Sequence, residues 1–280
     1  MPNEKKRRPL GAGKLRNPRS KMERRHSPMP ANTELDPWWS NPKNARLVKS
    51  QVEDHRLINQ RRAQFVKTAI TLFCRKGYHL TTVKEIAQTA DVSPGLIYQY
   101  VTDKEDILFL ALQLIVHATK RVVPASISKV DQPILRFVAA FTEYCRVMDE
   151  YRDAVVLTYR ETKSLTPEHR EAIKNMELES NKLIADCVKD CISAGYFRKV
   201  NVELFVYQTI MIAHAWALKH WRFREVTTIE DYIRIGLDNL MNSVLTQEGW
   251  QQYSRSTSGQ TPSKAERVSF VRPRTTGAKR

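Results

Sequence analysis

The side chains best suited to metal binding or redox chemistry are four cysteines, at positions 74, 145, 187 and 191. Cys187 and Cys191 stand four residues apart in a predicted helix, so that their sulfurs share one face and could hold a metal or oxidise. No second pair of ligands has the spacing that would complete a zinc site. The pattern favours buried, reduced cysteines, and we expect neither a metal nor a cofactor.

The motifs of common enzyme classes are missing from the sequence. There is no glycine-rich phosphate loop, no H-E-x-x-H zinc-protease motif and no G-x-S-x-G nucleophile elbow. His117, His169 and His214 have no obvious nucleophile near them in the sequence. We therefore expect a binding protein and not an enzyme.

Residues 61–112 have the pattern of short helices with strong capping signals. A first helix, about 52–76, has an apolar stripe at helical spacing, and Gly77 suits its C-cap. Thr82 and Glu85 have the spacing of a capping box, in which each side chain bonds the other residue's amide. A second helix is thus expected from about Thr82. The stripe of the first helix consists of Phe65, Ala69, Leu72 and Phe73.

A tight turn at Asp91-Val92-Ser93 follows. Ser93 is a suitable N-cap, and Pro94 fits a first helical turn, where no amide hydrogen is needed. The third helix is expected over Pro94 to Tyr100 and a longer fourth over Lys104 to Arg121. Two helices joined by such a turn predict a helix-turn-helix, which places its second helix in a DNA major groove.

These residues resemble the tetracycline-repressor (TetR/AcrR) family of bacterial regulators over about fifty positions. Two positions depart from the family pattern: Asp91 stands where glycine is usual, and Val101 where phenylalanine is common. Aspartate tolerates positive φ better than most residues, so the first change is mild. The matching residues are Leu72-Phe73, Gly77-Tyr78, Thr81-Thr82-Val83, Ile86-Ala87, Val92-Ser93, Gly95, Tyr98, Tyr100, Lys104-Glu105 and Ile107-Leu108.

The resemblance implies how the motif would meet DNA. Tyr98, Tyr100 and Lys104 are expected at phosphates, with help from Thr82 at its helix N-terminus. Ser93, Pro94, Gly95 and Gln99 are expected to face base edges. Of these, Gln99 can make a bidentate contact, best with adenine. The implied protein is a homodimeric, ligand-responsive transcriptional repressor that binds a palindromic operator. A DNA-binding architectural or nucleoid factor without an effector is the alternative.

The rest of the chain favours an all-α fold, with helices near 131–149, 151–161, 166–194, 202–220 and 228–246. The last two helices carry broad apolar faces. In the resembled family these two helices pair with their symmetry mates, so we expect the homodimer interface there. The expected interface residues are Phe205, Ile212, Trp216, Ile229, Ile233, Leu237 and Leu240.

An effector pocket is expected in the C-terminal helical domain, walled by apolar residues with a few polar groups. For each residue, ordinary core packing is the competing reading. The segment from Leu157 to Glu168 resembles a stretch in family members that answer acyl-CoA thioesters, where Arg160 and Lys163 would meet phosphate. The expected pocket residues are Tyr144, Met148, Tyr159, Arg160, Met176, Gln208, Met211 and His214.

The basic charge is concentrated in the two tails. The formal net charge is +16; residues 1–50 hold 13 Lys/Arg against 4 Asp/Glu, and residues 247–280 hold 7 against 2. We expect both tails to be disordered, either as arms that add phosphate affinity or as simple solvated termini. The expected domains are 51–112 for DNA binding and 122–246 for effector binding and dimerisation. The apolar runs are too short for a membrane span, and no secretory signal is evident, so a cytoplasmic, nucleoid-associated protein is expected.

Overall fold

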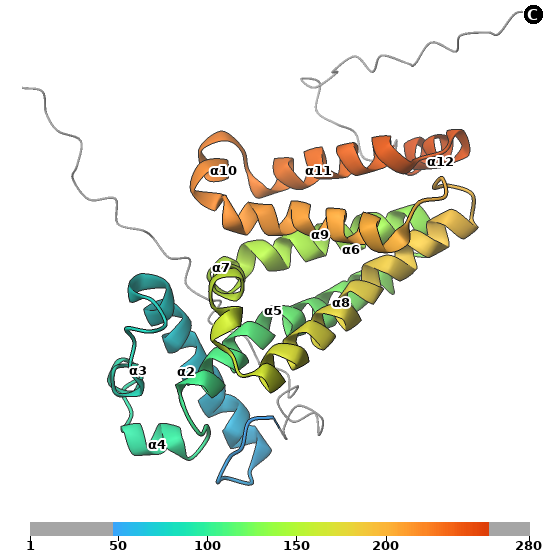
Figure 1. Cartoon of the computed structure of the whole chain (residues 1–280). Helices are drawn as coiled ribbons and strands as arrows, with labels where there is room; N and C mark the ends of the chain where they lie inside the picture. Colours follow the sequence, from blue (N-terminus) through green and yellow to red (C-terminus); the bar gives the residue numbers. More distant parts are fainter. Residues whose placement is uncertain (1–46, 258–280) are drawn as a thin grey trace, which may run out of the picture.

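The computed structural model describes residues 47–257, and within them helices provide nearly all the regular structure. A small unit of α2 (His55–Lys76), α3 (Val83–Thr89) and α4 (Pro94–Tyr98) lies at one end. Helix α5 (Lys104–Ile127) runs from this unit into the larger bundle (Figure 1). This arrangement is the two-part, all-α fold expected from the sequence.

The larger bundle is built around α5. It contains α6 (Pro133–Glu150), α7 (Arg152–Glu161), the short 3-10 turn η2 (Thr162–Ser164) and α8 (Pro167–Ser193). Helices α9 (Val202–Leu218) and α11 (Ile229–Val244) run side by side, joined by α10 (His220–Val226). The structure adds α10, which the sequence reading did not separate from its neighbours.

Local sequence signals start and stop these helices as predicted. Thr82 and Glu85 form the complete capping box of α3, and Ser93 caps α4 with Pro94 in its first turn. Asp91 adopts the only positive φ, 56°, of a non-glycine residue in the described region. Gly77, with φ of 95°, ends α2 where a side chain would be strained. The turn of the helix-turn-helix thus follows from its own residues.

Two tail boundaries predicted from composition are wrong. The C-terminal tail does not begin at 247, because α12 (Gln247–Thr257) packs against α6. Its capping group is the Thr246 hydroxyl, which accepts from the Gly249 amide, and Tyr253 lies against the core. At the other end, Val48 is only 2% exposed, so the folded part begins before residue 51. Residues 1–46 and 258–280 of the two tails lie outside the described residues.

Helix α5 is long and apolar enough to cross a membrane by length and composition. This differs from the sequence expectation, which saw no run of that length. In the folded protein most of the helix is buried, and Ile107, Leu108, Phe109 and Ala111 are fully covered by the surrounding helices. Its apolar character is therefore explained by its position at the centre of the bundle.

Candidate DNA-reading surface and ligand cavity

The second helix of the helix-turn-helix, α4, is anchored on one side and exposed on the other. Ile97 is fully buried, whereas Ser93, Pro94, Gly95, Tyr98 and Gln99 are all exposed. A Cβ added at Gly95 would meet nothing closer than 4.0 Å, so that position presents open backbone. Five of the residues predicted to meet DNA therefore share the free side of the motif. The groove beside them is also lined by Lys84 and Gln88 of α3, which the sequence reading did not single out.

Tyr100 and Lys104 lie differently from the sequence expectation. Tyr100 is 3% exposed, and its ring packs edge-on against Phe65, with centroids 5.9 Å apart. The Lys104 ammonium donates to the carbonyls of Tyr78 at 2.9 Å and Thr81 at 3.0 Å. Partial burial lowers the pKa of Lys104. The Tyr100 ring is thus part of the core of the motif, and the Lys104 ammonium is already bonded to backbone carbonyls.

A segment before α2 holds the end of the exposed helix in place. The Gln51 amide and the Ser50 hydroxyl both donate to the Gln99 carbonyl, at 2.8 and 3.1 Å. The buried Arg62 guanidinium donates to the carbonyls of Tyr100 at 3.0 Å and Val48 at 2.8 Å. These long-range bonds leave the Gln99 side chain free while fixing its backbone. The local sequence pattern does not predict these bonds.

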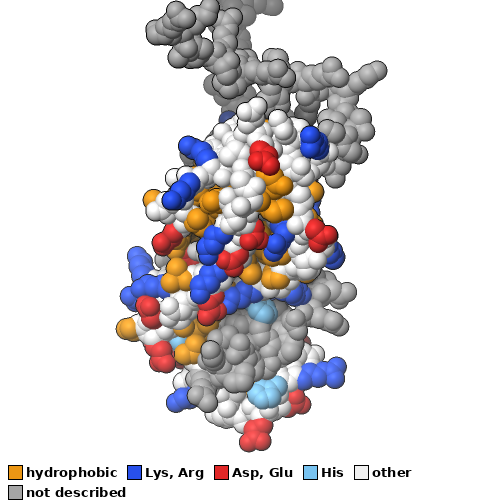
Figure 2. Space-filling model, turned by 90° about the vertical axis from the view of Figure 1, so that its right-hand side faces the viewer, with side chains coloured by type: hydrophobic (Ala, Val, Ile, Leu, Met, Phe, Trp, Pro, Cys, Tyr) orange, Lys and Arg blue, Asp and Glu red, His pale blue; other side chains and the backbone are white. Residues whose placement is uncertain are grey.

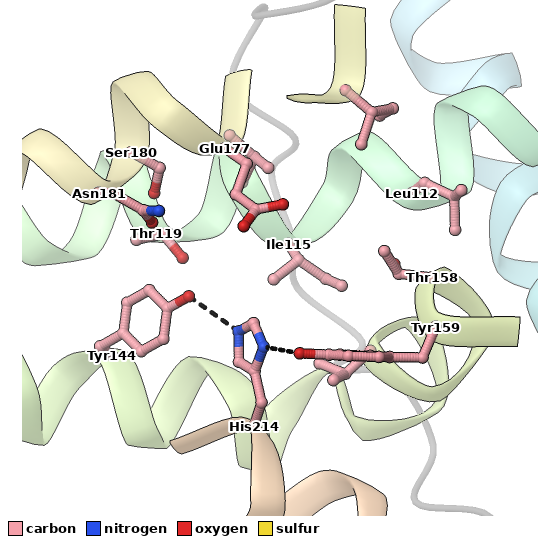
Figure 3. A pocket seen from close by; sticks show the side chains of 13 residues that line it. Leu112, Ile115, Thr119, Tyr144, Thr158, Tyr159, Glu177, Ser180, Asn181 and His214 are labelled. Carbon is pink, nitrogen blue, oxygen red and sulfur yellow. Dashed lines mark hydrogen bonds between the residues drawn. The ribbon is translucent and has the colours of Figure 1, made fainter. Parts of the chain in front are cut away.

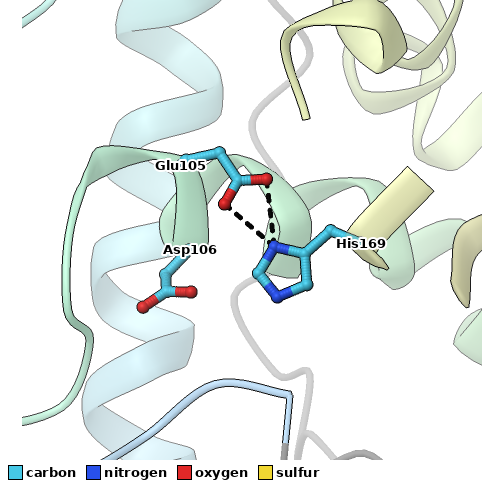
Figure 4. A group of neighbouring side chains, drawn as sticks. All are labelled: Glu105, Asp106 and His169. Carbon is cyan, nitrogen blue, oxygen red and sulfur yellow. Dashed lines mark hydrogen bonds and ion pairs between the residues drawn. The ribbon is translucent and has the colours of Figure 1, made fainter. Parts of the chain in front are cut away.

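The two parts of the protein are joined by a buried ion pair. His169, at the start of α8, lies 2.9 Å from the Glu105 carboxylate in the first turn of α5 (Figure 4). Its other ring nitrogen lies 2.9 Å from the Leu47 carbonyl, and its ring stacks on Phe109. Burial acts to lower the pKa of His169, but the Leu47 carbonyl and Glu105 carboxylate outweigh it, and the net pKa is raised. Both ring nitrogens face acceptors, which suits the protonated imidazolium.

Asp106 lies beside this pair, and ligand atoms of Glu105, Asp106 and His169 lie within 4.8 Å of one another. Each of these groups already has a protein partner: His169 pairs with Glu105, and Asp106 accepts from the Thr102 amide at 2.7 Å. We interpret the cluster as an interdomain ion pair. The cysteines are likewise unsuited to ligation at neutral pH, since burial raises the pKa of Cys187 to about 11 and of Cys191 to about 12.

A cavity of about 50 Å³ lies inside the bundle between α5, α6, α7, α8 and α9. Of the residues predicted for a pocket, Tyr144, Tyr159 and His214 line it (Figure 3). Met148, Arg160, Met176, Gln208 and Met211 are not among its lining residues, although Met211 accepts a bond from the Tyr159 hydroxyl. The lining residues that the sequence reading missed are Leu112, Ile115, Val116, Thr119, Val155, Thr158, Ile173, Glu177, Ser180 and Asn181.

His214 links two tyrosines across one wall of the cavity. Its ring nitrogens lie 2.9 Å from the Tyr144 hydroxyl and 2.7 Å from the Tyr159 hydroxyl. Burial lowers the pKa of His214 to about 4, so the ring is neutral at pH 7. A neutral imidazole donates through one nitrogen and accepts through the other. One tyrosine hydroxyl therefore donates a hydrogen bond to the ring, and the other accepts one from it.

Both parts of the chain match models of known protein families. The family described as "Bacterial regulatory proteins, tetR family" matches residues 65–111, and "Tetracyclin repressor-like, C-terminal domain" matches residues 130–221. The HTH-type transcriptional regulator HbdR of Aromatoleum sp. (strain CIB) is 42% identical over 206 residues, which cover 74% of this chain and 90% of that protein. The chain belongs to the TetR family. It is accordingly a helix-turn-helix DNA-binding transcriptional regulator, and the relatives that it matches are regulators.

Solved TetR-family structures share the fold. A tetR-family regulatory protein from Rhodococcus RHA1 aligns with a TM-score of 0.60 at 21% identity, covering 65% of this chain and 96% of that one. AibR, solved with isovaleryl coenzyme A and operator DNA, aligns with a TM-score of 0.57 at 18% identity, covering 65% and 98%. At these identities the likeness concerns the fold alone.

The predicted dimer residues mostly belong to the core of one TetR-fold protomer. Phe205, Trp216, Ile233, Leu237 and Leu240 are each 7% exposed or less, and Ile212 and Ile229 are partly buried. These five side chains are already covered within the protomer, so their place in an interface between protomers stays a prediction. The exposed apolar residues from α9 to α11 are Leu204, Met211, Trp221, Val226 and Ile235.

The face drawn in Figure 2 has no patch of a single charge. Lysine, arginine and acidic side chains are mixed with apolar ones over the face drawn in Figure 2. Most of the basic excess in the sequence lies in the tails, outside the described residues.

Proposed function

We propose that this TetR-family regulator is a homodimeric repressor that a small, mainly apolar effector releases from a palindromic operator. The observation that carries the proposal is the position of α5. Its first turn is tied to the DNA-binding unit, because the Asp106 carboxylate and the Lys104 ammonium both bond that unit or the loop leading from it. Leu112, Ile115 and Thr119 of the same helix wall the cavity.

A ligand in the cavity can move α5 only by separating the helices around it. The space of about 50 Å³ is far below the roughly 300–1,000 Å³ of typical ligand sites, so an effector would have to widen it. Opening it would displace α5 and with it α4 in each protomer. A dimer reads two half-sites about one DNA turn apart, so a change in the separation of its α4 helices weakens binding.

The effector class that we propose is an acyl-CoA thioester. In support, the structurally similar AibR was solved with isovaleryl coenzyme A. The cavity would take the acyl chain, and the coenzyme would remain outside. Arg160 is exposed and directly follows the lining residue Tyr159, so it stands where a coenzyme phosphate could be met.

The test uses labelled operator DNA and the full chain. Short- and medium-chain acyl-CoAs are added while DNA release is followed by fluorescence anisotropy. Arg160→Ala should keep operator binding and lose the response, whereas Arg255→Ala, an exposed arginine on α12, should behave like wild type. If no acyl-CoA releases DNA, the thioester proposal fails. If no small molecule of any class does so, the effector-free architectural factor becomes the better reading.

A homodimer is part of the same proposal. The exposed side chains of Leu204, Met211, Trp221 and Ile235 offer an apolar surface over α9, α10 and α11. An isologous contact would cover this surface twice, once on each protomer. For the DNA contacts we propose Ser93, Pro94, Gly95, Tyr98 and Gln99, with Thr82 at the α3 N-terminus and Lys84 beside them.

A further inference from the structure

One end of the cavity holds buried polar groups that have no partner among the described residues. Asn181 of α8 is 7% exposed, and neither its amide oxygen nor its amide nitrogen makes a hydrogen bond there. The Thr119 hydroxyl of α5, 1% exposed, is also unpaired. Figure 3 shows both near Ser180 and Tyr144, away from Leu112 and Thr158 at the other end. Buried polar groups are nearly always bonded, so this end is built for something that bonds them.

The required bonding group must both donate and accept. The Asn181 amide nitrogen can only donate, and its oxygen can only accept. The Thr119 hydroxyl can do either. A hydroxyl or a primary amide on the ligand satisfies this set, whereas an ester or ether oxygen only accepts and leaves the Asn181 oxygen unpaired.

The residues that line the cavity offer no positive charge to balance an anion. Among the residues that line it there is no lysine or arginine, and Glu177 extends into the space between the two ends. Burial raises the pKa of Glu177, and the neutral His214 ring supplies no positive charge. A carboxylate at this end would be buried without a counter-ion, which costs far more free energy than burying a hydroxyl.

We infer that Asn181 and Thr119 form a subsite for an uncharged hydroxyl or primary amide on an otherwise apolar ligand, and that this subsite rejects a carboxylate. The inference rests on the proposed function only in taking the cavity as the effector site. The apolar lining, which includes Leu112, Ile115 and Ile173, receives the hydrocarbon part.

The probes are hexan-1-ol and hexanoate, which share a six-carbon chain and differ in the end group. Their binding to the full chain at pH 7.5 is measured by ligand-observed NMR titration. Hexan-1-ol should bind at least about tenfold more tightly than hexanoate, the factor that about 1.4 kcal/mol produces. Asn181→Leu should remove most of this preference. Asn175→Leu, the same change at an exposed position of α8, should leave it intact.

Thr119→Val gives a second measurement because it removes one hydroxyl and keeps the side-chain shape; it should weaken hexan-1-ol binding and leave hexanoate unchanged. Equal binding of the two probes, no binding of hexan-1-ol, or an unchanged preference in a folded Asn181→Leu protein overturns the inference. Neither probe carries coenzyme A. If the preference is found but no thioester releases DNA, the subsite stands and the thioester proposal fails. If a thioester releases DNA but hexan-1-ol is not preferred over hexanoate, the thioester proposal stands and the subsite is refuted.

Discussion

Thr119→Val should stabilise the unliganded protein, although it alters the proposed effector site. The Thr119 hydroxyl is buried in α5 and unpaired among the described residues. An unbonded buried hydroxyl costs about 1–3 kcal/mol in protein mutational data, and valine has the same shape without that cost. A gain of about 1 kcal/mol in the free energy of unfolding raises Tm by roughly 2–4 °C for a domain of this size.

Thr209→Val is the matched control. Thr209 is fully buried in α9, but its hydroxyl donates to the Phe205 carbonyl at 2.8 Å. Its replacement should lower the stability by about 1 kcal/mol, the net contribution of one hydrogen bond. Thermal unfolding followed by circular dichroism compares both variants with wild type in the absence of ligand. If Thr119→Val loses as much stability as Thr209→Val, the Thr119 hydroxyl has a partner and the reasoning is wrong.

Three further outcomes follow from the described contacts. The raised pKa of His169 means that its ion pair stabilises the folded state below about pH 6.5 and that this contribution is lost as pH rises through the folded pKa. The Tm difference between wild type and His169→Gln should therefore shrink as pH rises above about 6.5. Lys104→Ala should lower the free energy of unfolding by about 1 kcal/mol or more, because the backbone carbonyls of Tyr78 and Thr81 lose their donor. The salt dependence of DNA binding should stay nearly constant. A clearly smaller slope of log K against log salt concentration would show that Lys104 contacts a phosphate. Ile235→Glu, at an exposed position, should yield a folded monomer by light scattering, whereas Ile233→Glu, in the core, should unfold the protein. If Ile235→Glu remains a folded dimer, the dimer interface does not include Ile235.

Local signals in the sequence predicted the helix-turn-helix closely. The capping box at Thr82 and Glu85 depends on residues three positions apart. The start of α4 depends on Ser93, which accepts from the Leu96 amide three residues later, and on Pro94 in the first turn. The positive φ at Asp91 is likewise a property of one residue and its neighbours. Such features can be predicted because their energetics are settled within a single turn of chain.

Residues whose role depends on distant partners could not be assigned from spacing. Lys104 sits at a family position for DNA contact, but its ammonium meets carbonyls more than 20 residues earlier in the chain. Trp216 was expected at the dimer interface from the family resemblance, and within the protomer its ring packs against Tyr232 of α11. A helix with apolar residues on several faces does not reveal which face packs inside its own protomer.

The same limit applies to the cavity. Tyr144, Tyr159 and His214 were predicted as aromatic or imidazole groups in apolar helices, and the structure brings them together. Thr119 and Asn181 were missed because a single threonine or asparagine in a helix is usually unremarkable. Their significance appears only when burial and missing partners are known.

The most direct test of the account is DNA protection by the full chain. Fragments selected from genomic DNA are footprinted with wild type and with Gln99→Ala. The account predicts protection of two half-sites related by a two-fold axis about one helical turn apart, and a loss of about 1–3 kcal/mol of discrimination at one position per half-site in the variant. Protection of a single unpaired site, or binding without sequence preference at physiological salt, would contradict it.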